Sequence, residues 1–548
     1  MPFSHLEYTL AFLTVAAIAL LSRRRFKASS RVSSLPLPPG PPCWPIIGSF
    51  FSLPDATEPI WIWFTRWANK TKSDTIHFRV LGTDTVVLNT REAALELLEK
   101  RSNKYSDRPS MVMLKDLVGW RQLLGMSDYS ERTRVIRRYM HNSMSSKKIL
   151  VRCVNIIQGR RIGFFKSCYC RLRTSWLISD ILHSTAGASV VRLTYGYIPK
   201  DEDDEYIEKA EHVMDVFSLA STPGTFMVDV FPILRYVPWA PFKRTAMRWR
   251  QELSELIDLP MEFVYKQMQD DLAESSFVSQ WLEESGHKND KRFIPAAATS
   301  LYAGGADTTV SAISTFFVAM LHYPEAQRLA QKEIEETLGK DILPTFKDRA
   351  SLPYVEALFK EVMRWKPIAP IGIPHRLGSQ TDDEYEGRFS SIAKVDYTDD
   401  SMPEGLRIPA NSTVIANIWN MLRDPNVYQN PENFDPSRFF RENPEPDPEE
   451  VVFGFGRRLM KLAQSLSWNS RCPFIRLVVN SAHTGCVQDN CTYWNGWELC
   501  VSFSRVLQWD REVSSNASVS LDAIESIKYD IAATPDRSNA MSNQGQKG

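Results

Sequence analysis

The sequence lacks an excess of charge of either sign. Lys and Arg together number 65, Asp and Glu also number 65, and the formal net charge of the 548 residues is therefore zero. A protein that binds nucleic acid generally shows a basic patch or a strongly basic composition. The sequence gives no such footprint, so we expect no nucleic-acid partner. Its 43% hydrophobic content is sufficient for a large core.

Cysteine is also scarce, with 8 residues in the chain. No two of them form paired C-x-x-C motifs, so the sequence does not indicate a zinc site. Disulfide frameworks are typical of small secreted domains, and we expect none in a chain of this size. No internal repeat is visible, which argues against a solenoid or propeller.

Long hydrophobic runs are almost absent, and the clearest one lies at the N-terminus. Tyr8–Leu21 carries no charge and is followed directly by Arg23, Arg24, Arg25 and Lys27. A transmembrane helix needs about 20 residues, which this run approaches when its weakly polar flank is included. A signal peptide has its charges before the apolar core, the reverse of this order. Positive charges stay on the cytosolic side.

We therefore predict a membrane anchor over residues 1–28, with the bulk of the chain facing the cytosol. A proline-rich hinge over residues 29–48 would act as a stiff spacer, because proline fixes φ and favours extended chain. The alternatives are a cleaved signal peptide, a helix lying in the membrane interface, and an apolar start without regular structure.

Helical periodicity dominates the middle of the chain. It predicts helices over Thr90–Glu99 and Ala326–Leu338, and a long apolar helix over Phe293–His322 that is broken at Gly304-Gly305. Strand-like stretches are few and short: Thr75–Val80, Thr85–Leu88 and Ser412–Ile415. The pattern indicates a mainly α protein with small β-sheets.

Several short motifs follow one another along the chain, each weak alone. Together, and in this order, they resemble the motifs of the cytochrome P-450 family. The sequence that flanks them is similar to that of membrane-bound fungal enzymes of secondary metabolism. The motifs are Tyr129–Arg138, Ala303–Thr309, Glu361–Arg364, Pro374–Arg376, Pro436–Phe439 and Phe453–Arg458.

The resemblance implies a single large helical domain over residues 49–468 that binds haem. It further implies a monooxygenase that places one oxygen atom into a lipophilic small molecule, such as a terpenoid, polyketide or indole-type metabolite. Electrons would come from NADPH–cytochrome P-450 reductase. The expected location is the endoplasmic reticulum membrane, with a single span.

The same resemblance assigns roles to individual residues. Thr308 would hold dioxygen and a water, and Asp307 would relay protons for O–O cleavage. A local break of the helix at the preceding glycines would open backbone groups to water. Arginine forks suit carboxylates, and they would bind the haem propionates. The expected haem-binding residues are Arg137, Arg376, Phe453, Gly456 and Arg458, with Arg134 a weaker candidate because Thr133 stands at the family's tryptophan position.

Glu361 and Arg364 lie one helical turn apart and can face the same side. By resemblance they join Arg438 in a buried salt-bridge network behind the haem, a structural role rather than a catalytic one. Taken alone, the pair would be read as an ordinary surface ion pair.

The chain departs from the family at the metal ligand. Met460 occupies the register of the family's haem cysteine, and Lys461-Leu462 stand where Pro-Gly would follow. The family's chemistry needs a thiolate, and a neutral thioether cannot replace its electron donation. Cys472 precedes a proline, but it lies well downstream and lacks the following glycine. We therefore assign no metal ligand.

Two segments also depart from the family pattern. Arg388–Gly405 is a polar, aspartate-rich insert, and joining Gly387 to Leu406 would restore the family's tight hairpin. Residues 469–548 form a divergent C-terminal segment. Two explanations stay open: a catalytically inactive P-450-like scaffold, or a mis-spliced message that lost the cysteine and gained the insert together.

Overall fold

The computed structural model describes residues 35–55, 58–145, 176–200, 204–284, 291–339, 346–378, 382–385 and 405–458. The predicted anchor, Met460, Cys472 and the divergent segment 469–548 lie outside the described residues, as does most of the insert 388–405. The described residues divide into two compact units. The first takes in the described residues up to Tyr105 and those between His375 and Ile415, and the second takes in those between Ser106 and Pro374 and those from Ala416 to Arg458.

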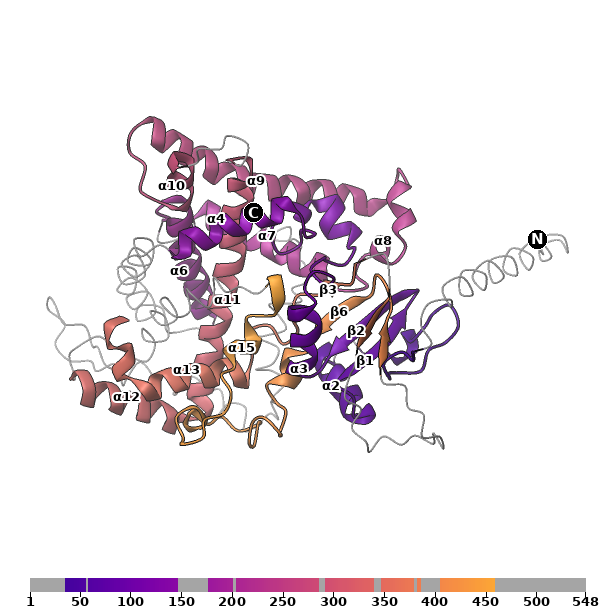
Figure 1. The fold of residues 1–548 in the computed structure, drawn as a ribbon. Coiled ribbons are helices and arrows are strands. Elements are labelled where there is room, and N and C mark those ends of the chain that lie inside the picture. Colours follow the sequence, from indigo (N-terminus) through magenta and orange to yellow (C-terminus); the bar gives the residue numbers. More distant parts are fainter. Residues whose placement is uncertain are drawn as a thin grey trace, which may run out of the picture. The chain divides into compact units, whose positions relative to one another are not determined.

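The first unit is built around a four-stranded sheet with the order β1-β2-β6-β3 (Figure 1). Strands β1 and β2 pair antiparallel, with Val80 opposite Thr83. The two residues between them, Leu81 and Gly82, both have positive φ values of 47° and 88°. That geometry is a two-residue turn whose twist matches the flanking strands. The strands are β1 (Thr75–Val80), β2 (Thr83–Leu88), β3 (His375–Arg376) and β6 (Thr413–Ala416).

A second, two-stranded sheet in this unit borders the atypical insert. Strand β4 (Asp383–Tyr385) pairs antiparallel with β5 (Leu406–Ile408), and Tyr385 lies opposite Leu406. The two strands of the hairpin that the sequence predicted are thus paired, although residues 386–404 separate them. The helical elements of the unit are η1 (Phe50–Ser52), α2 (Ile60–Thr71), α3 (Arg91–Ala94) and the π-helix η2 (Leu95–Lys100).

The second unit is helical. Its α-helices are α4 (Glu131–Ser145), α6 (Trp176–Tyr195), α7 (Glu205–Ser221), α8 (Met227–Val230), α9 (Pro241–Gln269), α10 (Phe277–Glu284), α11 (Ile294–His322), α12 (Pro324–Leu338), α13 (Pro353–Trp365), α14 (Ile418–Met421) and α15 (Glu449–Val452). Shorter 3₁₀ and π segments are η3 (Val112–Val118), η4 (Trp120–Gln122), η5 (Pro232–Tyr236), η6 (Lys291–Phe293), η7 (Phe346–Ser351), η8 (Pro436–Phe439) and η9 (Gly456–Arg458).

Helix α11 is the central element of this unit and packs along α6 (Figure 1). Pro295 near its start suits the first turn, where backbone N–H groups have no helical partner. By length and composition Lys291–His322 could cross a membrane. Its buried side chains instead contribute to two hydrophobic clusters, one with α9 and one with α12 and α13. We therefore interpret it as a core helix.

The element predictions are largely confirmed, with two corrections. Strand β1 matches its predicted range and α12 begins two residues before its predicted start, whereas Thr90–Glu99 changes from α- to π-helix at Leu95. The predicted break at Gly304-Gly305 is wrong, because α11 is a continuous α-helix from Ile294 to His322.

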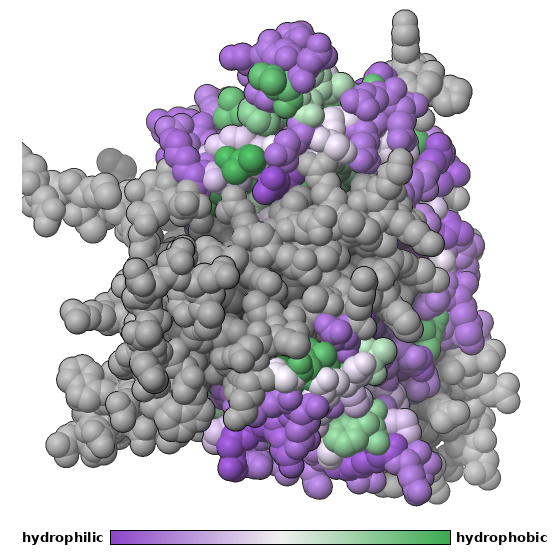
Figure 2. Space-filling view, turned by 90° about the vertical axis from the view of Figure 1, so that its left-hand side faces the viewer, coloured by the Kyte–Doolittle hydropathy of each residue, from purple (hydrophilic) through white to green (hydrophobic). Residues whose placement is uncertain are grey.

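On the face shown in Figure 2 the described residues are mostly hydrophilic, with hydrophobic residues in small separate groups.

Candidate active site

The centre of α11 carries two neighbouring threonines with similar hydrogen bonds and different exposure. The Thr308 hydroxyl donates to the Gly304 carbonyl at 2.8 Å, and the Thr309 hydroxyl donates to the Gly305 carbonyl at 2.7 Å. Both hydroxyls thus bond back to a carbonyl four residues earlier, and the α-helix continues through the two glycines. Thr308 is exposed, while Thr309 is partly buried. A hydroxyl that donates within the helix retains acceptor capacity, so Thr308 can accept a hydrogen bond from a ligand.

The neighbouring residues face different surroundings. A Cβ atom at Gly305 would lie 3.2 Å from a methyl carbon of Val190 on α6. The glycine therefore permits close helix packing. Asp307 is half-buried. Burial, together with the negative charges of Glu211 and Asp307, raises the pKa of Tyr302 well above its usual range.

The glycine-rich segment that follows α15 forms a tight turn. Gly454 and Gly456 have φ values of +82° and +66°, a region that side chains rarely adopt. Between them Phe455 is buried, while Phe453 is half-buried. The turn ends in η9, whose last residue is Arg458. Glycine at positions 454 and 456 therefore allows the tight turn that leads the backbone into η9 and to Arg458.

The turn lies close to the start of α4. The guanidinium of Arg457 stands 5.2 Å from the ring centre of Tyr129. Arg137 on α4 is half-buried, and burial lowers the pKa of its guanidinium, with Tyr129 acting in the opposite direction. An anionic group beside Arg137 would favour its charged form. Arg134, the weaker candidate, is exposed and pairs with Glu131 at 2.8 Å.

Arg376 belongs to the first unit. It lies in β3 opposite Thr413 of β6 and is half-buried. Its neighbour His375 is buried, and a ring nitrogen of His375 lies 2.7 Å from the Tyr105 carbonyl oxygen. This bond fixes the strand that carries Arg376.

The structure brings Glu361, Arg364 and Arg438 together in a buried cluster. Arg364 donates from Nε and Nη2 to the two carboxylate oxygens of Glu361 at 2.8 and 2.9 Å. The Nε of Arg438 lies 3.1 Å from Glu361 Oε2. Exposure of the three side chains is 0%, 0% and 1% respectively. Such a bidentate, desolvated geometry is the strong form of an ion pair.

The cluster includes partners that the motifs did not reveal. Glu445 accepts from Arg438 Nη1 at 2.6 Å, which gives this guanidinium a second carboxylate. The Asn433 carbonyl accepts from Arg364 at 3.0 Å and from Arg438 at 3.1 Å. Glu445 stands in a Pro-rich stretch without helical periodicity, so spacing could not have paired it with Arg438. A backbone carbonyl leaves no signal in the sequence.

The family model for cytochrome P450 matches residues 38–459 of this chain. The chain belongs to the cytochrome P450 family. The match ends one residue before Met460, where the motif resemblance also fails. The mainly helical fold with small sheets agrees with this membership.

Curated relatives from fungi carry monooxygenase names. Cytochrome P450 monooxygenase 208 of Postia placenta is 36% identical over 82% of this chain and 83% of its own length. Tryptamine 4-monooxygenase of Psilocybe cyanescens is 36% identical over 80% of this chain and 85% of its own length. Cytochrome P450 monooxygenase ppsD of Aspergillus oryzae is 32% identical, covering 83% and 84%. This P450 chain is therefore an enzyme of the monooxygenase class, whose members generally use a redox partner and lipophilic substrates.

The residues present include groups that would suit a haem's propionates and oxygen chemistry, but not a thiolate that would bind its iron. Arg137 is a half-buried cation whose charged form an anionic neighbour would favour, and Thr308 offers an exposed hydroxyl at the centre of α11. Among the residues that the structure describes, the one cysteine is Cys43, which is exposed and remote in sequence from the Phe453–Arg458 turn. The described residues therefore supply no thiolate for the iron.

Proposed function

We propose that this P450 acts as a haem-dependent monooxygenase on a lipophilic small molecule of fungal secondary metabolism. The observation that carries the proposal is the exposed Thr308 hydroxyl, held by its bond to the Gly304 carbonyl at the centre of α11. The relative named for tryptamine makes an indole-type substrate the first class to test, with terpenoids and polyketides next.

The residues would divide the work by their chemistry. When bound, haem supplies the oxygen-activating iron centre. Thr308 would accept a hydrogen bond and so position a water, while the half-buried Asp307 next to it in the sequence would hold and pass a proton. Arg137, Arg376 and Arg458 would bind the propionates through their planar donors. Phe453 and Gly456 would shape the turn that borders the haem site.

The role of Thr308 is tested against its neighbour. Thr308→Ala and Thr309→Ala each remove one hydroxyl bond to a glycine carbonyl four residues earlier, so both should perturb the helix equally. In a form of the chain that carries the family's cysteine, only Thr308→Ala should divert electrons from product to peroxide. The measurement is the ratio of product to NADPH consumed. Equal coupling in both variants would remove Thr308 from the mechanism.

The rival function is a non-catalytic P450-like scaffold, and the methionine at the cysteine register favours it. The unmodified chain should then fail to give the red-shifted ferrous–CO band that marks thiolate ligation. The check is an absorbance spectrum of the purified full chain after haem loading. A strong thiolate-type band would exclude the scaffold and make Cys472 the first residue to replace.

An incorrectly spliced message explains both departures, and one feature of the fold supports it. Strands β4 and β5 place Tyr385 opposite Leu406. If Gly387 were joined to Leu406, Glu386-Gly387 would be the two residues between them, which is the loop length typical of tight hairpins. The flanking strands thus keep the register of a chain without residues 388–405. Sequencing the transcript across residues 380–480 tests this, and an unaltered message would reject it.

We further propose that residues 1–28 anchor the enzyme in the endoplasmic reticulum membrane, where NADPH–cytochrome P450 reductase would supply electrons. The support is the apolar run followed by basic residues. The full chain should sediment with microsomes and resist carbonate extraction, and deletion of residues 1–28 should release much of it. A full-length protein that stays in solution without detergent would contradict the anchor.

A further inference from the structure

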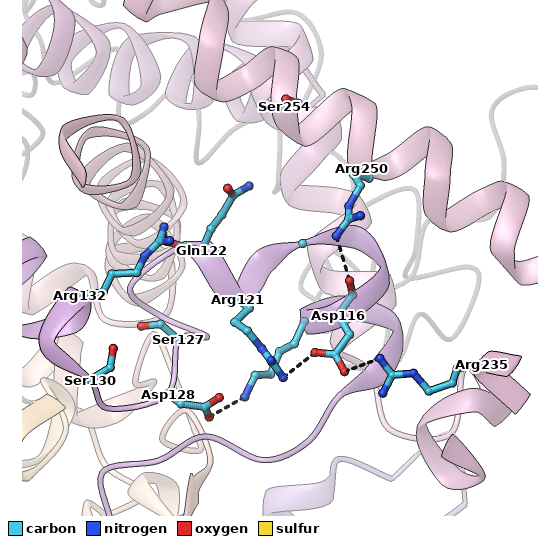
Figure 3. A pocket seen from close by; sticks show the side chains of 12 residues that line it. Asp116, Arg121, Gln122, Ser127, Asp128, Ser130, Arg132, Arg235, Arg250 and Ser254 are labelled. Atoms are coloured by element: carbon cyan, nitrogen blue, oxygen red, sulfur yellow. Dashed lines mark hydrogen bonds and ion pairs between the residues drawn. The ribbon is translucent and has the colours of Figure 1, made fainter. Parts of the chain in front are cut away.

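A polar pocket of about 980 Å³ opens on the second unit, away from the α11 segment of the proposed function (Figure 3). Its walls come from the η3–η4 region, the start of α4, η5 and α9. Five of its lining side chains are basic and two are acidic. The basic residues are Lys115, Arg121, Arg132, Arg235 and Arg250.

Both acids are already engaged within the pocket. Asp128 pairs with Lys115 at 2.9 Å. Asp116 bridges Arg121 at 2.6 Å and Arg235 at 3.3 Å. Figure 3 shows these ion pairs in the wall of the pocket. The pocket thus keeps three positive charges in excess.

Two guanidiniums account for much of that excess. Arg250 reaches down from α9 and donates to the Asp116 backbone carbonyl at 3.1 Å. Arg132 donates to the Gln122 carbonyl at 2.7 Å, and its Nε is buried without a hydrogen-bond partner. Among the described residues, neither arginine has a carboxylate partner. Burial, and then the charge of Arg292, lowers the pKa of Arg132. A bound anion would relieve both costs.

We propose that this pocket binds a phosphate group. Arginine offers planar forks of donors that match phosphate oxygens, and several arginines around one cavity can share a doubly charged anion. The phosphate has two possible sources: a soluble phosphate ester, or the headgroup of a phospholipid. None of the lining residues belongs to the Gly304–Thr309 segment, so the proposal stands or falls independently of the catalytic one.

The surroundings of Arg235 are relevant to the lipid source. Arg235 lies in η5, and the side chains around it in sequence are apolar and exposed. Ile233 is 74%, Tyr236 76% and Trp239 81% exposed. If the phosphate of a lipid headgroup paired with Arg235, its acyl chains could contact these exposed apolar side chains, which neighbour Arg235 in the sequence.

The first experiment titrates the full-length protein, in neutral detergent at low ionic strength, with inorganic pyrophosphate in a calorimeter. We expect saturable binding that weakens as salt is added, since screening reduces exposed ion pairs. Arg250→Gln should weaken binding about fivefold. Its matched control is Arg248→Gln, on the same helix, which removes a 70% exposed arginine paired with Glu252 outside the pocket. This control should bind as the parent does.

A second variant guards against misfolding of the first. Ser254→Glu leaves every arginine in place and sets a carboxylate one helical turn from Arg250. It should also weaken pyrophosphate binding severalfold. The absence of saturable binding by the parent protein, or equal losses in the Arg250 and Arg248 variants, would overturn the proposal.

The source is decided by comparing glycerol 3-phosphate with dihexanoyl phosphatidate, used below its micellar concentration. A phospholipid site should bind the lipid about tenfold more tightly, because acyl carbons are buried, and Trp239→Ser should abolish that gain. Equal affinities assign the site to soluble phosphate esters. Failure of both ligands to bind would exclude a phosphate site.

Discussion

Two clusters of arginine and carboxylate in the second unit differ in burial and in the balance of their charges. Around Glu361, two guanidiniums share two carboxylates and several backbone carbonyls, and the side chains are almost fully buried. Around Asp116, the arginines are partly exposed and outnumber the acids. In the first cluster each guanidinium is paired with a carboxylate, whereas the second keeps an excess of positive charge.

The difference shows what each cluster can do. A buried ion pair cannot lose one member cheaply, because the remaining charge has no water to solvate it. An exposed pair contributes little to stability, since water and salt compete with the partner. We therefore expect changes around Glu361 to affect folding and changes around Asp116 to affect ligand binding.

The largest effect should follow from Glu361→Gln. The change leaves Arg364 short of its carboxylate and weakens the contact to Arg438, so the free energy of unfolding should fall by about 3–5 kcal/mol. Urea unfolding followed by circular dichroism measures it. The matched control is Glu325→Gln on α12, which also pairs with an arginine three residues later but on the surface. A loss of under 1 kcal/mol for Glu361→Gln would contradict the prediction, because the buried cluster would then contribute no more to stability than a surface ion pair.

Glu445→Gln should have an intermediate effect. Arg438 would keep Glu361 and two backbone acceptors, and lose one charge-assisted bond of 2.6 Å. The expected loss is about 2 kcal/mol, measured by the same unfolding. An unchanged free energy of unfolding would mean that Glu361 is the only carboxylate whose pairing with Arg438 stabilises the fold.

A smaller, pH-dependent effect is expected in the sheet of the first unit. Burial raises the pKa of Asp84, but hydrogen bonds from His77 and Arg79 outweigh burial and lower it below its usual value. The folded pKa is thus depressed, so this carboxylate stabilises the fold above about pH 4 and loses that contribution as pH falls through the depressed value.

Asp84→Asn should therefore cost about 1 kcal/mol at pH 7, and much less at pH 3. Urea midpoints at several pH values between 7 and 3 measure the difference. Glu336→Gln, at an exposed pair with Lys332, should show no such dependence. A penalty for Asp84→Asn that stays constant with pH would contradict the ionic origin.

The smallest effect on stability is expected for Arg250→Gln. The side chain is exposed and donates to one backbone carbonyl. The free energy of unfolding should change by less than about 0.5 kcal/mol, even though pyrophosphate binding weakens. A loss of stability as large as that for Glu445→Gln would show that the pocket is a structural cluster, and would end its contrast with the Glu361 cluster.

Much of the site was visible in the sequence because its residues are local. Glu361 and Arg364 lie one turn apart on an amphipathic helix, and the spacing alone places them on one face. The roles of Thr308 and Asp307 were predicted through the Ala303–Thr309 motif and stay predictions. The continuity of α11 was missed, because glycine propensity favours a break while the packing of Gly305 against Val190 on α6 favours the continuous helix.

The sequence by itself determined the family, the mainly helical class and the methionine at the cysteine register, because each depends on the order and spacing of residues along the chain. The tertiary structure decided which distant groups meet. Only folding sets Glu445 against Arg438, places Tyr385 opposite Leu406 across the insert, and brings Arg235 and Arg250 to Asp116. Such contacts depend on packing between elements far apart in the chain, and a local sequence pattern does not show which distant elements pack together.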